Sequence, residues 1–362
     1  MKIALVAPLV TAIREPQLGG SQAMVADLAT GLSERGHEVH LYAATGSAVA
    51  GVGVVDTGVD AGALQAFLYR DGVTRGADQS PVADAFARVY DTLRQDQYDI
   101  VHNHAFDAPA VLIAESIPWP VVHTLHLPPE PEVAAALRHA EGSAHPPTVA
   151  AVSDSHANGW RAFARIDLVL RDGVPVARIP WSAAAGTGAL FAGRFSPEKG
   201  AAEAIAIARA AGVPIDLYGD PYDATYARDQ VESKQAEPGV AVHGGLPRTE
   251  LWRRMARALA VICAPKWEEP FGMVAAEAQA TGTPVVAFRR GALHELIVDG
   301  QTGFLVAPGD IGAAAAALKQ VGSLRREACR RHAELDLNLV TTLLAHERLY
   351  ARLRSAAAAS RG

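Results

Sequence analysis

Two carboxylates in the stretch 264–286 have the type and spacing to bind sugar hydroxyls. Glu269 lies in a loop, and Glu277 follows eight positions later on a predicted helix of otherwise small, apolar residues. A carboxylate on such a surface costs free energy unless another group pairs with it or hydrogen-bonds to it. Glu277 could accept hydrogen bonds from the two vicinal hydroxyls of a ribose, and Glu269 could reach a second polyol, such as a transferred sugar.

A basic turn, GRFSPEKG at residues 193–200, follows a predicted strand and opens a predicted helix. Arg194 and Lys199 lie near that helix's amino end, where free N–H groups and the macrodipole favour an anion. The fork of a guanidinium and the point charge of an ammonium together suit a diphosphate, with no metal needed. No D-x-D pair occurs in the sequence. A solvated basic turn is the alternative, and glycoside hydrolysis by the two carboxylates is a weaker one because it gives this turn no role.

The front half adds a glycine pair and several histidines. Gly19 and Gly20 could let backbone amides approach a phosphate, although the G-x-G-x-x-G fingerprint is absent and an ordinary surface turn is the alternative. His102 and His104 end one predicted strand, and His126 ends another. Strand carboxyl ends in a doubly wound sheet face the ligand crevice. These histidines therefore form either a shared site or separate, hydrogen-bonded structural residues.

Alternating strands and helices position these residues. A buried strand, a helix and a second strand open the chain, which predicts a right-handed crossover and a parallel sheet. The expected elements of the front half are strands at 2–8, 37–42, 100–101 and 120–126, and helices at 23–35 and 80–95. Residues 149–160 repeat the pattern of a strand that ends in polar residues, with Ser153 and Asp154 capping the helix that follows.

A second series follows the linker-like segment 182–188. Its expected strands are 189–192, 215–218, 240–243, 260–263, 285–288 and 303–306, and its helices 205–210, 249–258, 274–280, 293–298, 311–321 and 337–354. The sequence thus predicts an α/β protein of two Rossmann-like, doubly wound parallel-sheet domains facing a central cleft. We expect the domains at 1–180 and 181–337, with a helix at about 338–357 crossing back to the first.

Composition excludes several classes of protein. Lys and Arg number 33 against 39 Asp and Glu, a net charge of -6, which argues against nucleic-acid binding. Residues 1–180 hold 12 basic and 20 acidic residues, so docking on an anionic membrane is not expected either. The two cysteines show no metal-ligand spacing, and no apolar run reaches the roughly 18 residues of a membrane span. The N-terminus fits a first strand better than a signal peptide, so a cytoplasmic protein is expected.

Several motifs together resemble the retaining GT-B glycosyltransferases of family 4. EPFGMVAAE matches that family's Glu-x7-Glu motif and GRFSPEKG its Arg-x4-Lys-Gly motif. LGGSQ, DIVHNH and GALHELIVDGQTGFLV stand in the family's order, so the resemblance covers nearly the whole chain. It implies a nucleotide-sugar donor held mainly by the back domain, and a transferase of the EC 2.4 class.

The resemblance also implies roles for single residues. Glu277 would hold the ribose hydroxyls, Arg194 and Lys199 the diphosphate, and Glu269 the donor sugar. Gly20, preceded by Gly19, would close on the diphosphate from the front domain, and His104 would lie beside the reacting sugar. The remaining donor contacts would come from His243 and Gly244 at the base and from Phe271, Gly272, Met273 and Val274 at the sugar and phosphates.

The expected reaction is metal-independent transfer from a UDP- or GDP-sugar to a hydroxyl acceptor with retention of configuration, in carbohydrate biosynthesis. No cofactor is expected beyond the co-substrate. The acceptor would be a small molecule or glycan, with His126 and Asp154 as acceptor-side candidates, and homo-oligomerisation is left open. A nucleotide-sugar epimerase, a sugar phosphorylase and a non-catalytic binding module are the alternatives. Alanine at Glu277 or Lys199 should abolish transfer and leave the fold intact.

Overall fold

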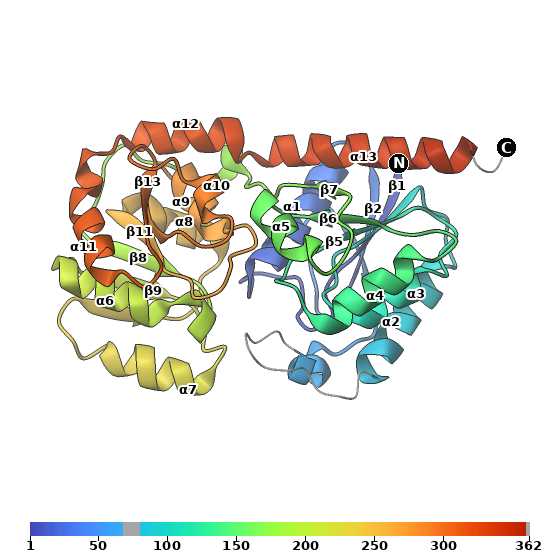
Figure 1. The fold of residues 1–362 in the computed structure, drawn as a ribbon, viewed down its shortest axis with the longest axis horizontal. Helices are drawn as coiled ribbons and strands as arrows, with labels where there is room; N and C mark the ends of the chain where they lie inside the picture. The colour runs from blue at the N-terminus through green and yellow to red at the C-terminus, as the bar shows by residue number, and fades with distance from the viewer. Residues whose placement is uncertain (68–79, 360–362) are drawn as a thin grey trace. The chain divides into compact units, whose positions relative to one another are not determined.

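The computed structural model describes residues 1–67 and 80–359, which divide into the two compact units drawn in Figure 1. The first unit comprises Met1–Arg14, Ser21–Asp172 and Val340–Gly362, and the second comprises Glu15–Gly20 and Gly173–Leu339. The chain therefore enters the second unit earlier than the expected joint at 180–181. The segment Glu15–Gly20 belongs to the second unit, although the sequence places it in the front domain.

The first unit is built on a parallel sheet with the strand order β3-β2-β1-β4-β5-β6-β7. Short apolar runs form these strands because both faces of the sheet are covered by helices. The strands are β1 (Lys2–Val6), β2 (Glu38–Ala43), β3 (Gly53–Asp56), β4 (Ile100–Asn103), β5 (Val121–Thr124), β6 (Thr148–Ala151) and β7 (Leu168–Val169). The helices are α1 (Gly20–Glu34), α2 (Ser80–Leu93), α3 (Ala108–Ala114), α4 (Pro131–Glu141), α5 (Asp154–Arg161) and the terminal α13 (Leu339–Ala359).

The second unit repeats the plan with the parallel order β10-β9-β8-β11-β12-β13. Its strands have the predicted bounds: β8 (Ala189–Ala192), β9 (Ile215–Tyr218), β10 (Val240–His243), β11 (Ala260–Cys263), β12 (Val285–Phe288) and β13 (Gly303–Val306). Its helices are α6 (Ala201–Ala211), α7 (Ala224–Tyr226), α8 (Arg248–Arg257), α9 (Met273–Ala280), α10 (Leu293–Leu296), α11 (Ile311–Gln320) and α12 (Arg326–Asp336). The helices α6 and α11 pack together over a core that includes Ile205, Leu217, Ile262 and Leu318.

Each sheet reverses its strand order at one point, and this confirms the predicted doubly wound fold class. The reversal lies between β1 and β4 in the first sheet and between β8 and β11 in the second. Ligands of open α/β sheets bind outside the carboxyl ends of the strands at such a switch point. The loops that follow β8 and β11 are therefore the first place to look for a site in the second unit.

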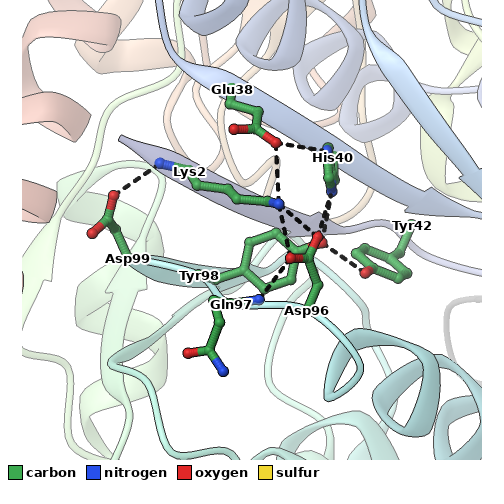
Figure 2. A network of polar contacts seen from close by, with 8 residues as sticks. All are labelled: Lys2, Glu38, His40, Tyr42, Asp96, Gln97, Tyr98 and Asp99. Carbon is green, nitrogen blue, oxygen red and sulfur yellow. Dashed lines mark hydrogen bonds and ion pairs between the residues drawn. The ribbon is translucent and has the colours of Figure 1, made fainter.

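A polar network, shown in Figure 2, joins the amino ends of β1 and β2 to the segment before β4. Lys2 Nζ donates to Asp96 at 2.8 Å and lies 3.1 Å from Glu38. The hydroxyl of Tyr98 lies 2.7 Å from His40 Nδ1 and 2.8 Å from the hydroxyl of Tyr42, which completes the network. Burial raises the pKa of both tyrosines, so the phenols stay protonated and can donate. These contacts fix the amino ends of the strands, whereas a ligand at the switch point would bind at their carboxyl ends.

Candidate functional site

The predicted basic turn lies at the switch point of the second sheet. It follows β8, and the loop that carries Glu269 follows β11, the neighbouring strand. Gly200 ends the turn with a left-handed φ of 75°, and a Cβ there would lie 1.8 Å from the carbonyl oxygen of Ala264. Only glycine allows this approach, so the turn packs directly against the start of the loop.

Lys199 and Glu269 come together in this structure. Lys199 Nζ donates to both carboxylate oxygens of Glu269, at 3.0 and 2.9 Å. Trp267 Nε1 donates to the same carboxylate at 2.7 Å, and its ring centroid lies 4.4 Å from Lys199 Nζ. The predicted phosphate-binding ammonium and the predicted sugar-binding carboxylate are therefore immediate neighbours, 70 residues apart in the chain.

Arg194 is the second cation of the turn. Its Nη2 donates to Glu198 Oε1 at 2.9 Å, and its guanidinium carbon lies 4.1 Å from the centroid of the Tyr222 ring. The buried Nε has no hydrogen-bond acceptor among the residues that the structure describes. The guanidinium therefore has N–H groups left that can donate to an anionic oxygen without loss of its present contacts.

The start of α9 supplies backbone donors beside Glu269. Gly272 is the N-cap with a left-handed φ of 102°, and its carbonyl oxygen accepts from the third and fourth N–H groups of the helix. The N–H groups of Met273 and Val274, at the first turn, have no intrahelical acceptor. A Cβ on Gly20 would lie 3.0 Å from Met273 Cγ, so the segment with Gly19 and Gly20 closely approaches this helix start. Phe271, immediately before Gly272, is buried.

Glu277 is buried, as predicted, but its ion-pair partner does not belong to the basic turn. No hydrogen bond or ion pair links it to Arg194 or Lys199 within the described residues. Its partner is Arg248, whose Nε and Nη2 both donate to Glu277 Oε1, at 3.0 and 2.8 Å. The charge of this carboxylate is thus compensated inside the second unit before any ligand binds.

Arg248 is a site residue that the sequence analysis missed. It begins α8, and its guanidinium lies 4.9 Å from the ring centroid of Trp252, one turn further on. The helix macrodipole disfavours a cation at the amino end of a helix. Arg248 in the segment PRTEL, residues 247–251, therefore indicates that an anionic side chain compensates its charge. The partner itself cannot be identified from the sequence, because 29 positions separate the two residues.

His243 and Gly244, the residues predicted at the base, follow the edge strand β10. The His243 ring stacks on Tyr218 with centroids 4.7 Å apart, and its Nε2 lies 2.9 Å from Asp216 Oδ1. Gly244 lies beside Asp220, which accepts a hydrogen bond from the next backbone N–H. This end of the sheet therefore offers an aromatic face and backbone groups, the combination that a nucleobase needs.

The histidines predicted at the rim of the first sheet form a stacked, buried group. His104 Nδ1 lies 2.9 Å from His126 Nε2, and the His104 ring stacks on His102 at 3.9 Å. His102 Nδ1 in turn contacts the hydroxyl of Tyr350 in α13 at 2.5 Å. His104 Nε2 is buried with no acceptor or donor among residues 1–67 and 80–359. The group is thus a shared cluster rather than separate structural histidines, and it has one unsatisfied nitrogen.

Asp154, the other acceptor-side candidate, lies in the first turn of α5 and pairs with Arg171. Its neighbour Ser153 is the N-cap of that helix and accepts from the N–H of His156 at 3.0 Å, which confirms the predicted cap. The Asp154 side chain is 59% exposed. Its role at an acceptor stays a prediction.

Burial lowers the pKa of the histidines in this region, because a charged imidazolium loses its hydration there. The pKa falls to about 4 for His123, His156 and His346, and to about 3 for His126. The pKa values of His102 and His104 lie well below the ordinary value for the same reason. At neutral pH the whole group is uncharged, so it can offer and accept hydrogen bonds but not a positive charge.

The first unit should lose stability steeply on acidification. An unfolded histidine binds a proton below about pH 6.5, while these buried ones do not. Each buried histidine therefore lowers the free energy of unfolding by up to about 1.4 kcal/mol for every unit by which the pH falls. The loss starts near pH 6.5 and levels off near pH 4, or near pH 3 for His126. Hydrogen exchange of β4 and β5 amides at pH 7.5 and 5.5, corrected for intrinsic rates, measures it.

Asp172 has the opposite effect, because burial raises the pKa of its carboxyl group. A raised carboxyl pKa favours the folded state at low pH and is therefore a partial offset to the histidines. The second unit is the internal control, since this histidine cluster belongs to the first unit. Equal loss of protection in β11 and β12, or none in β4 and β5, would contradict the assignment of the effect to the buried histidines.

No helix in the described ranges is long and apolar enough to cross a bilayer. No group of three or more His, Cys, Asp or Glu side chains in those ranges has the arrangement of a metal site.

Comparison with protein-family models assigns both halves of the chain. The model described as "Glycosyltransferase Family 4" matches residues 18–177, and the model described as "Glycosyl transferases group 1" matches residues 187–335. The two matches leave residues 178–186 between them and follow the order of the two sheets.

Curated relatives match over part of their length. A glycogen synthase of Mycobacterium tuberculosis is 33% identical over 197 residues, which is 50% of this chain and 47% of the relative. A D-inositol 3-phosphate glycosyltransferase of an Arthrobacter strain is 32% identical over 252 residues, 58% of this chain and 59% of the relative. The chain thus spans about half the length of the curated relatives it matches.

Solved structures match over nearly the whole chain. The sucrose-phosphate synthase of Thermosynechococcus elongatus has a TM-score of 0.79 at 18% identity and covers 98% of this chain and 99% of its own. Anabaena HepE in complex with UDP and glucose has a TM-score of 0.74 at 21% identity, covering 97% of this chain and 99% of its own. At these identities the likeness concerns the fold.

Proposed function

Because this chain belongs to the GT-B glycosyltransferases of family 4, we propose that it transfers a sugar from a nucleotide-diphosphate donor to a hydroxyl acceptor. The donor is a UDP- or GDP-sugar, and the anomeric configuration is retained. The observation that carries the proposal is the meeting of Arg194, Lys199 and Glu269 at the switch point of the second sheet. A helix begins directly after each of the two loops, at α6 and α9, and adds backbone donors.

In the proposed complex the donor diphosphate exchanges partners with the protein. Each cation of the turn now pairs with a carboxylate, Lys199 with Glu269 and Arg194 with Glu198. Lys199 pairs with the diphosphate in place of Glu269. Glu269 is then able to accept hydrogen bonds from the sugar hydroxyls. The cations neutralise the charge that develops on the leaving nucleoside diphosphate, so the proposed reaction needs no metal.

Other residues complete the proposed donor site. Glu277 accepts from the ribose hydroxyls, and the ring and backbone at His243 and Gly244 meet the base. Support for a diphosphate comes from complexes of a structural relative, since Anabaena HepE was solved with UDP-glucose and with UDP. A role for His104 beside the reacting sugar, a small-molecule or glycan acceptor, and a cytoplasmic location stay predictions from the sequence.

A thermal-shift screen with UDP-, GDP-, ADP- and dTDP-sugars tests the proposal. A ligand at 100 times its Kd adds about 2.7 kcal/mol to the free energy of unfolding, so the correct nucleotide should raise the Tm clearly above the others. The matched control is Lys199→Ala, in which the shift should largely disappear. No shift with any of the four would contradict the proposal. Isomerised donor without transfer would favour an epimerase, and binding without transfer or hydrolysis would favour a binding module.

A further inference from the structure

The carboxylate of Glu277 is held through one oxygen only. Arg248 Nε and Nη2 both donate to Oε1, at 3.0 and 2.8 Å, rather than forking across both oxygens. Oε2 accepts no hydrogen bond from the described residues, although the side chain is only 6% exposed. One oxygen is thus fixed by the protein, and the other has unused lone pairs in a place that bulk water reaches poorly.

Arg248 itself is fixed from three directions. Its backbone N–H donates to Glu15 Oε2 at 3.0 Å, its guanidinium lies over Trp252, and its Nε and Nη2 donate to Glu277. The side chain is 10% exposed, so the guanidinium has little freedom to move. Because α8 and α9 pack together, the contact joins the first residue of one helix to the second turn of the other.

We infer that Arg248 is a positioning residue that fixes the orientation of the Glu277 carboxylate and aims its free oxygen, Oε2, at the ribose of the donor. The inference rests on the proposed function, in which Glu277 binds the ribose hydroxyls. With the rotamer of Glu277 fixed, the two lone pairs of Oε2 can accept from both hydroxyls at once. Arg248 therefore determines how well the site distinguishes a ribonucleotide from its 2′-deoxy analogue, without touching the nucleotide through its guanidinium.

Calorimetric titration with a matched pair of nucleotides tests this. The probes are UDP and 2′-deoxy-UDP, or GDP and 2′-deoxy-GDP if guanine nucleotides give the larger thermal shift. Loss of a hydrogen bond to a charged group corresponds to a factor of roughly 10 to 100 in Kd, which is the preference for the ribonucleotide expected of the wild type. In Arg248→Met the ratio should fall to near 1, although Glu277 is still present.

Two further variants separate positioning from general damage. Arg253→Met lies on the same helix, where the arginine is exposed and pairs with Glu250, and it should keep the wild-type ratio. Arg248→Lys keeps the charge but cannot place two donors on one oxygen, so its ratio should lie between those of wild type and Arg248→Met. If Arg248→Met does not fold, the Arg248→Lys ratio decides.

The outcomes separate this inference from the proposed function. Equal weakening of both nucleotides in Arg248→Met and Arg248→Lys, with an unchanged ratio, means a merely structural role and overturns the inference while donor binding stands. A wild type that binds both nucleotides equally also overturns it alone. A wild type that binds neither overturns the proposed function, and the inference with it.

Discussion

Lys199→Ala should lower the turnover number for donor cleavage by roughly 100- to 1,000-fold, the usual effect of removing one preorganised group that stabilises developing charge. The Lys199 ammonium already lies at the switch point beside Glu269 and the Trp267 ring, and in the proposed complex it exchanges Glu269 for the donor diphosphate before the leaving group forms. The measurement is release of nucleoside diphosphate from the donor that gives the largest thermal shift, with water as the acceptor.

Lys266→Ala is the matched control for this prediction. Lys266 lies in the loop that carries Glu269, but its ammonium pairs with Glu203 at 2.6 Å and is 51% exposed. Its removal should leave turnover within a factor of about two, because exposed ion pairs contribute little. Similar losses in the two variants, or near-normal turnover in Lys199→Ala, would mean that charge at this position does not assist the departing diphosphate.

Glu277→Ala should destabilise the second unit by about 3–5 kcal/mol, because it leaves the guanidinium of Arg248 buried without its counter-charge. The sequence alone predicted that alanine at Glu277 leaves the fold intact. That prediction included no partner for the carboxylate inside the protein, and Arg248 is such a partner. Donor binding should weaken as well, by roughly 10- to 100-fold, because the ribose contact is lost. Urea unfolding, monitored by hydrogen exchange of the β11 and β12 amides, measures the free energy of unfolding of the second unit.

A double variant separates stability from function at this pair. Arg248→Met with Glu277→Leu removes both charges, and replacing a buried ion pair by apolar groups of similar size is often neutral. We therefore expect the double variant to recover most of the lost stability and still to bind nucleotide as weakly as Glu277→Ala. Additive losses in the double variant would contradict the buried-pair explanation, since residues in contact should couple.

Local patterns were sufficient for much of the fold, above all in the second unit. Its strands are short apolar runs between glycine- and proline-containing loops, and these letters fix their bounds closely. In the first unit, the missed elements include β3 and α4, since β3 is a half-buried edge strand and α4 is mostly alanine and polar residues. The helix α12 was missed because charged residues cover most of its surface.

The candidate site could be predicted only where its residues are close in sequence or belong to a motif. The turn at 193–200 and the stretch with Glu269 were found in this way, and the switch point then brings them together. Arg248 and Tyr350 were not found as partners, because their contacts with Glu277 and His102 span 29 and 248 positions. Such pairings depend on which helix packs on which, and a single sequence does not contain that information in local form.

In the proposed function the second unit holds a nucleotide through its diphosphate. Titration of wild type and Lys199→Ala with UMP and UDP tests this most directly. GMP and GDP replace these probes if guanine nucleotides give the larger thermal shift. We predict that the wild type binds the diphosphate roughly 10- to 100-fold more tightly than the monophosphate, as expected when charge-assisted hydrogen bonds to the second phosphate are added. In Lys199→Ala most of this preference should disappear. Equal affinity of the wild type for the two nucleotides, or an unchanged ratio in Lys199→Ala, would contradict the account.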